Sequence, residues 1–379
     1  MKRTASTVLL LTWFSWFWSH GTRVGIPAIT PFLRQRLSIS TSEAAAIPGL
    51  VNLGFYVFTF FSGRIAAKIG FRNGVVMATL GAGSMVAAAS FLENVYLLYG
   101  AVFAMGLLMS LHLPSAIPWL GTLFKGPRQG LIIGLHESAA PAGQTLGPVI
   151  LALLFSALAY PPLALWALLP VCVGTALLLS TNYNRGHYMP EGKSDEEKNK
   201  KLISLTVVST SNLVGNLGVV AIVPLHLVDT FGLDKSFVAT LVGVSRVVGV
   251  FGQPLGGHLH DRFGFMRVAS AATLLNFVSS LYLMVAPYSF FYGVVMVIQA
   301  ASTAMYFPVV YSHVVKNYGD AAPQVLGKMF SAAGLLGPTS APFIAGFLAE
   351  RLSYSAALAY PTALALAGVV ALRSIRLRE

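Results

Sequence analysis

Three charged residues stand well inside long apolar stretches of the sequence, away from the ends of the stretches, where a charge is costly. They are Arg23, Glu137 and Arg246, and every other acidic residue falls in a polar segment or at the end of an apolar stretch. An ionised side chain in such a setting usually faces a water-filled cavity, a substrate or a partner of opposite charge. These three residues are therefore the first candidates for a functional site.

The two arginines favour an anion as the bound species. A guanidinium cannot lose its proton to escape the cost of burial, and its planar donors match a carboxylate or phosphate in pairs. Glu137 can neutralise at most one of them, so at least one of Arg23 and Arg246 should lack a fixed partner. We expect the two arginines to face each other across a cavity and to hold an anion. The alternative is that either one simply pairs with Glu137.

Glu137 is the candidate for holding a coupling proton. Burial disfavours the charged carboxylate, which makes proton binding near neutral pH plausible chemistry for this residue. The alternative is an ion pair without a transport role. His136 is the adjacent residue, and in a continuous helix it points about 100° away, so we expect no contact between His136 and Glu137.

Other polar residues in apolar stretches could line the same cavity. His20 precedes Arg23 by one helical turn, and Asn52 and Tyr56 share a helix face. The full predicted lining, besides the arginines, is His20, Asn52, Tyr56, His112, Asn216, Gln253, Gln299 and Tyr306. For each amide or tyrosine, an interhelical hydrogen bond is the alternative reading.

The surrounding sequence predicts an all-α integral membrane protein. Hydrophobic residues make up 55% and charged residues 10% of the chain, against about 25% charged in soluble domains. Twelve apolar stretches are long enough to cross a bilayer as helices. They are Thr7–Leu33, Ala44–Ala67, Gly74–Leu92, Val95–Phe124, Leu131–Leu158, Pro161–Leu179, Leu202–Val228, Phe237–Leu259, Ala269–Ala286, Phe290–Val315, Val325–Ala349 and Tyr354–Leu372.

The twelve stretches form two sets of six around one polar segment. We expect a six-helix half over residues 1–180, a cytoplasmic linker over 181–201 and a second half over 202–379. Most Lys and Arg fall on the linker side of this topology, which predicts both termini in the cytoplasm and the plasma (inner) membrane as the location. The net charge of +12 is spread over these loops, so it does not indicate nucleic-acid binding.

The two halves repeat each other at a shift of 193 or 194 residues. Pro31 corresponds to Pro224, and His112–Pro114 corresponds to Tyr306–Pro308. Parallel six-helix repeats are a transporter architecture with the substrate site between the halves.

One loop carries a family signature. The segment GHLHDRFGFMR, from Gly257 to Arg267, resembles the loop motif of the major facilitator superfamily, and the first half has Ala67 and Lys68 where the motif has its acid and arginine. The resemblance implies twelve helices in two pseudo-symmetric halves. It also implies a gating role for Gly257, Asp261 and Arg262, with Asp261 meeting the start of the helix predicted over 325–349.

The resemblance and the charges together predict a secondary active transporter. We expect it to move a small organic anion by alternating access, with protons as the candidate coupling ion. A drug or lipophilic-compound exporter and a neutral sugar transporter are the alternatives. No catalytic motif is present, so we expect no enzyme activity, no cofactor and no metal. The expected partners are the substrate and the lipid bilayer, and the expected state is a monomer.

Overall fold

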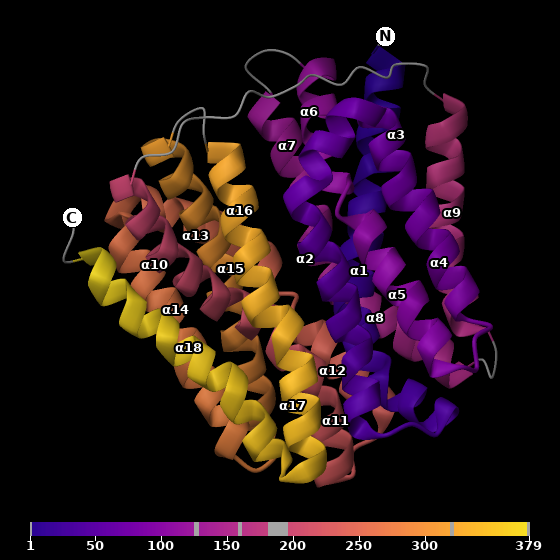
Figure 1. Ribbon diagram of the computed structural model, residues 1–379, viewed down its shortest axis with the longest axis vertical. Helices are drawn as coiled ribbons and strands as arrows, with labels where there is room; N and C mark the ends of the chain where they lie inside the picture. The colour runs from indigo at the N-terminus through magenta and orange to yellow at the C-terminus, as the bar shows by residue number, and fades with distance from the viewer. Residues whose placement is uncertain (1, 125–128, 158–160, 181–195, 319–321, 377–379) are drawn as a thin grey trace.

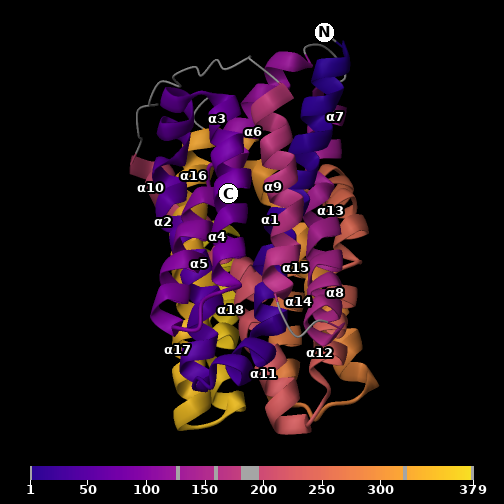
Figure 2. The same cartoon turned by 90° about the vertical axis from the view of Figure 1, so that its right-hand side faces the viewer.

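The computed structural model describes residues 2–124, 129–157, 161–180, 196–318 and 322–376, and in these ranges every regular element is helical. The helices form two groups that lie side by side, coloured indigo to magenta and pink to yellow in Figure 1. α1 to α9 build the first group and α10 to α18 build the second. Figure 2 shows that in both groups the helices run nearly parallel to the long axis.

Several of the membrane-crossing stretches are built from two or three consecutive helical segments. In the first half the elements are α1 (Lys2–Leu37), α2 (Thr41–Ile69), α3 (Phe71–Val76), η1 (Met77–Gly81), α4 (Ala82–Ala89), α5 (Val95–Met109), α6 (His112–Leu123), α7 (Gln129–Glu137), α8 (Ala139–Ala157) and α9 (Pro162–Ser180).

The second half also contains whole and interrupted helices, but most of its interruptions fall at other crossings than in the first half. Its elements are α10 (Glu196–Leu213), η2 (Val214–Gly218), α11 (Val219–Phe231), α12 (Lys235–Ser245), α13 (Gly249–Phe263), α14 (Phe265–Val285), α15 (Phe290–Tyr318), α16 (Ala322–Gly334), η4 (Leu335–Thr339), α17 (Ser340–Arg351) and α18 (Tyr354–Arg376). α10 begins at Glu196, inside the segment expected to be linker, and residues 181–195 lie outside the described part.

Ten helical spans are long and apolar enough to cross a membrane by themselves. The other two predicted crossings are α1, whose hydropathy is lowered by His20 and Arg23, and the short α3–η1–α4 segment that begins with Arg72 and Asn73. Both are helical and packed inside the first bundle, so the described chain contains all twelve expected crossings.

The two halves make their closest contacts at one end of the molecule. One apolar core joins Val24 and Ala28 of α1 and Ala152 of α8 to α11, α12 and α17 of the other half. In Figure 1 these helices meet at the bottom, whereas α13, α15 and α16 diverge from α2 and α7 towards the top. We call the top, where α9 ends and α10 begins, the linker end, and the bottom the far end.

Polar contacts at the far end reinforce this closure. Arg34 at the end of α1 forms a bidentate ion pair with Asp229 of α11, and Tyr354 donates to the same carboxylate. The backbone N–H of Ser42 donates to the carboxylate of Glu350 across the same junction, at 3.0 Å. The far end is therefore closed by both apolar packing and charge-assisted hydrogen bonds.

The internal repeat is visible in buried hydrogen bonds. Ser15 bonds His112 at 2.9 Å in the first half, and Ser209 bonds Tyr306 at 2.8 Å in the second. Both residues of the second pair follow their counterparts by 194 positions, which is the shift found in the sequence. The two halves therefore share their internal packing as well as their helix order.

Candidate substrate-binding site

Arg23 is held in the first half by neutral groups alone. Its Nη2 donates to Asn52 Oδ1 at 3.2 Å and to Tyr56 Oη at 2.9 Å, both on α2. The guanidinium carbon also lies 4.0 Å from the ring centroid of Phe55. The residue is 6% exposed, and its Nε has no hydrogen-bond partner. The arginine is thus oriented by amide, phenol and aromatic groups that leave its positive charge uncompensated.

Arg246 occupies the break between α12 and α13. Hydrogen bonds from Arg246 N to Gly243 O and from Gly249 N to Arg246 O replace the regular helical pattern. The residue is 4% exposed, and its Nε and Nη1 are buried without any hydrogen-bond partner. A buried guanidinium without acceptors is unfavourable. The described surroundings of Arg246 therefore lack the acceptor that its chemistry requires.

Two glycines place the Arg246 break against the opposite half. A Cβ on Gly243 would lie 2.5 Å from the carbonyl oxygen of Thr145 in α8, so only glycine allows this approach. Six residues later, Gly249 lies near Pro141 of α8 and Ala304 of α15. Arg246 lies between these two glycines in the chain, so its backbone lies where the two halves meet.

Glu137 contacts neither arginine in the described structure, and its ion-pair partner is His136. The distance from His136 Nδ1 to Glu137 Oε1 is 3.0 Å. The expectation that these neighbours make no contact is wrong, although both lie in the last turn of α7. Their Cβ atoms point about 100° apart, but the two long side chains still meet at their ends.

His112 and His20 also lie in the first half but contact different groups. His112 is 1% exposed and contacts Ser15 on one ring nitrogen and His136 on the other. His20 Nδ1 is 3.1 Å from Gln144 Nε2 of α8. In the part of the chain that the structure describes, no group of three His, Cys, Asp or Glu has a metal-binding arrangement.

The predicted lining residues separate into two groups. Asn52 bridges the halves, since it accepts from Arg23 and donates to the carbonyl oxygen of Pro338 at 3.2 Å. Asn216 contacts Thr303 at 3.4 Å, and its Oδ1 is buried without a partner. By contrast, Gln299 bonds Ser280 and Tyr306 bonds Ser209, and both are interhelical bonds inside the second half.

Gln299 and Tyr306 are at most 2% exposed, and Gln299 Nε2 and Tyr306 Oη are bonded within their own half. Their place in the cavity lining stays a prediction. Gln253 is half-buried on α13. Sequence spacing places a residue on a helix face, but it does not say whether that face meets a neighbouring helix of the same half or the other half.

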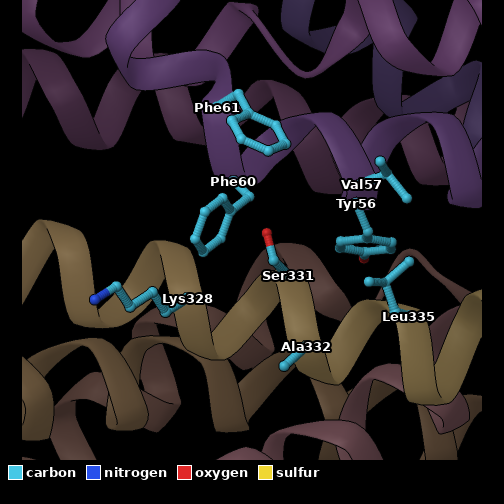
Figure 3. Close-up of a pocket in the computed structure, with 8 residues that line it drawn as sticks. All are labelled: Tyr56, Val57, Phe60, Phe61, Lys328, Ser331, Ala332 and Leu335. Atoms are coloured by element: carbon cyan, nitrogen blue, oxygen red, sulfur yellow. The ribbon is translucent and has the colours of Figure 1, made fainter.

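A pocket opens between α2 and α16. Its volume is about 310 Å³, and it is lined by Tyr56, Val57, Phe60, Phe61, Lys328, Ser331, Ala332 and Leu335. Figure 3 shows Phe60 and Phe61 of α2 opposite Lys328 and Ser331 of α16, with the ring of Tyr56 beside Leu335. Tyr56 lines the pocket and also accepts a hydrogen bond from Arg23, so this side chain connects the pocket to the arginine. Sequence reasoning found Tyr56 but missed the apolar walls.

The predicted cytoplasmic latch is not formed in this conformation. The Asp261 side chain is 84% exposed, and its ion-pair partner in the described part of the chain is the neighbouring His260 at 3.5 Å. Arg262 is exposed with its guanidinium 5.2 Å from the Phe263 ring, and a Cβ on Gly257 would meet nothing within 4 Å. These residues lie at the linker end, where α13 and α16 diverge from the first half.

Sequence reasoning missed the far-end ion pair. Arg34 and Asp229 were placed at helix ends facing the aqueous phase, where opposite charges usually act independently. Their pairing depends on how the end of α1 meets the end of α11. Asp229 follows Arg34 by 195 residues, so no local pattern could have indicated this contact.

The chain was compared with known proteins. The family model of the Major Facilitator Superfamily matches residues 8–214 and 205–379. A curated relative, the probable sulfoacetate transporter SauU of Cupriavidus necator, is 23% identical over 98% of this chain and 94% of its own length.

Among solved structures, the fold resembles an inward-facing bacterial homologue of the lysosomal transporter Spinster. The TM-score is 0.76 at 15% identity, with 100% of this chain and 96% of the other covered. It also resembles the nucleoside transporter NupG, with a TM-score of 0.79 at 10% identity over 98% of this chain and 99% of the other. The helical architecture, the repeat and the match over both halves lead to one conclusion: this chain is a membrane transporter that belongs to the Major Facilitator Superfamily.

Proposed function

We propose that this protein transports a small organic anion by alternating access, with Arg23 and Arg246 as the anion-binding residues. The observation that supports this most strongly is Arg246. Its guanidinium is buried, its backbone lies where the halves meet, and two of its nitrogens lack an acceptor. Arg23 adds a second charge whose described partners are all neutral. An anion between them supplies the missing acceptors and offsets both charges.

The chemistry of the substrate follows from the two cations. Each guanidinium can bind one carboxylate, sulfonate or phosphate group in a bidentate manner. The curated relative is described as a probable sulfoacetate transporter, and sulfoacetate carries a sulfonate and a carboxylate. A small dianion of this kind is therefore our first choice, with a monocarboxylate as the second.

The conformation and orientation are part of the same proposal. The distribution of Lys and Arg places the linker end in the cytoplasm. The far end is closed, and the pocket beside Tyr56 lies towards the linker end, so this structure represents an inward-facing state. Substrate then reaches the arginines between α2 and α16.

Direct binding measurements test the proposal. Thermal stability of the purified protein is measured with sulfoacetate, simple carboxylates, sugars and lipophilic cations, because a ligand of the folded state raises the apparent stability. For the best anion, Arg23→Ala and Arg246→Ala should each weaken binding by about 2–5 kcal/mol. Lys at either position should restore little of the anion affinity, since it keeps the positive charge but lacks the planar, paired donors of the guanidinium.

The matched control is Arg373→Ala, which removes an exposed arginine from α18 and should leave binding unchanged. Near-normal anion affinity in both alanine variants would refute the proposed anion site. Stabilisation by lipophilic compounds alone would instead favour an exporter that uses the apolar walls at Phe60 and Phe61.

A further inference from the structure

A second cluster of ionisable residues lies in the first half, apart from the arginines. His112 Nε2 is 3.2 Å from His136 Nε2, and His136 Nδ1 is 3.0 Å from Glu137 Oε1. The other ring nitrogen of His112 is 2.9 Å from Ser15 Oγ. The three ionisable groups therefore form one continuous chain of hydrogen bonds, from the buried Ser15 to the partly exposed Glu137.

The backbone decides the direction of the first bond in this chain. Thr79 Oγ1 is 2.7 Å from the carbonyl oxygen of Val75, which can only accept, so the single hydroxyl proton of Thr79 is used there. In the 2.5 Å contact with Ser15, Thr79 must then accept and Ser15 must donate. Ser15 has no second proton, so it accepts from His112 Nδ1–H.

Counting protons along the chain gives an excess of one. Three hydrogen bonds, Ser15–His112, His112–His136 and His136–Glu137, each need a proton supplied by the two imidazoles or the carboxyl group. Two neutral imidazoles and a carboxylate supply two. The count is the same whether the third proton is on His112, His136 or Glu137.

We propose that His112, His136 and Glu137 together form the proton-binding site of this transporter, and that the structure represents its proton-loaded state. The Glu137 side chain is 39% exposed and is the entry point for the proton, whereas the His136 side chain is fully buried. Removing the proton leaves one of the three contacts without a hydrogen, so that two lone pairs face each other at hydrogen-bond distance. That repulsion breaks the chain of hydrogen bonds.

The surroundings suit a site that gains and loses one positive charge. Trp16 stacks on His112 with ring centroids 4.9 Å apart and planes 7° apart, and an indole face stabilises a nearby cation. α7 packs against α1, α6 and α8. Among the described residues, the ionisable groups near the site are His20 on α1, which itself lies near Arg23, and Tyr311 on α15 of the other half; α8 contributes none.

The site is linked to the arginine site through one helix. Trp16, His20 and Arg23 are spaced by four and three residues, so they share one face of α1. A proton bound at the histidines adds positive charge on that face and favours an anion at Arg23. By reciprocity the anion favours the proton. This coupling rests on the proposed function, whereas proton binding itself does not.

Proton binding can be measured without any substrate. Trp16 fluorescence is followed against pH in purified protein, with Trp16→Phe to identify the Trp16 signal among the five tryptophans. We expect one transition that disappears in Glu137→Gln, whose amide donates to His136 Nδ1 without an added proton. His136→Gln should abolish it too, and infrared spectra should lose one protonated carboxyl or imidazolium signal.

The matched control is His226→Gln, which changes another buried histidine, bonded to Thr230 on α11. It should keep the Trp16 transition. A transition unchanged in Glu137→Gln, which keeps the size of the side chain, would overturn the proposal even if His136→Gln fails to fold. Thr79→Val frees Ser15 to donate to His112 and should move the transition to lower pH; an unmoved transition would refute the proton count.

Transport assays then separate the two proposals. In Glu137→Gln, substrate exchange should persist and pH-driven accumulation should be lost. If the Trp16 transition is lost in Glu137→Gln but the native protein binds no anion, the proposed function is refuted and the proton site is retained. Anion binding with pH-driven accumulation intact in Glu137→Gln would remove the proton site alone.

Discussion

At the scale of single residues, the two arginines differ in what surrounds them. Arg23 is oriented by Asn52, Tyr56 and Phe55, so its side chain is already positioned before a substrate arrives. Arg246 has no such support among the described residues and retains two unsatisfied nitrogens. We infer that Arg23 positions the anion. We also infer that anion binding stabilises Arg246 more than Arg23, because the anion supplies the hydrogen-bond acceptors that Arg246 lacks among the described residues.

Replacing Asn52 with Asp should block the anion site. The new carboxylate would stand 3.2 Å from Arg23 Nη2 and neutralise the charge that the substrate needs. We expect anion affinity to fall at least tenfold, measured by thermal shift and equilibrium binding, while the fold is retained. The control Tyr56→Phe removes one neutral hydrogen bond and should have a smaller effect. Unchanged affinity in Asn52→Asp would show that Arg23 does not bind the anion.

At the scale of elements, broken helices place the functional groups. The α12–α13 break carries Arg246, and Glu137 is the last residue of α7, directly before the break at Ser138. In each case the chain leaves the regular helical pattern at or beside a functional residue.

The close approach of α12 to α8 should tolerate no side chain at position 243. Gly243→Ala would place a Cβ 2.5 Å from the Thr145 carbonyl oxygen, so the helices must separate. We expect a loss of about 1–3 kcal/mol, typical of overpacking, seen as a lower unfolding temperature. Gly100→Ala in α5 is the control, because nothing lies within 4 Å of its added Cβ. Equal stability of the two variants would contradict the described packing.

At the scale of the whole molecule, the closed far end and the separated linker end define one of two states. Apolar packing of α1, α2 and α8 against α11, α12 and α17 closes the far end. The Arg34–Asp229 pair and its Tyr354 partner add an electrostatic contact that forms only when the halves meet there. These interactions should break when the protein opens to the far side.

Asp229→Asn should shift the population towards far-end opening. Both side chains of the pair are about one quarter exposed, so we expect the pair to contribute on the order of 1 kcal/mol, a several-fold change in the ratio of states. Spin labels at Glu93 and Leu352, in a Cys172→Ser background, would report a longer distance in the variant. An unchanged distance distribution would show that apolar packing alone holds the end closed.

Asp261→Asn should act only on the opposite state. Asp261 is exposed here, so the variant should leave the stability and anion affinity of this conformation unchanged. If the loop motif closes the linker end in the other state, transport should slow while equilibrium binding stays normal. Native transport rates in the variant would remove the latch from the mechanism.

The amino-acid sequence by itself determined the fold class and the family. The lipid environment requires about twenty apolar residues for each crossing, so hydropathy reports the helices directly. The internal repeat and the loop motif at Asp261 added the two-half architecture, and the match of the family model over both halves confirms the superfamily. Mean hydropathy alone does not identify α1 as a membrane-spanning helix, because α1 carries His20 and Arg23. The domain boundaries and the role of each site residue stay predictions.

Only the tertiary structure decided which polar residues meet. Spacing placed Gln299 and Tyr306 on helix faces, but it could not show that each bonds a neighbour inside its own half. The Arg34–Asp229 pair joins helix ends that are far apart in the sequence, and the His136–Glu137 contact depends on side-chain conformations that periodicity does not describe. Periodicity describes a helix in isolation, whereas such contacts depend on how helices break and on which neighbour each one meets.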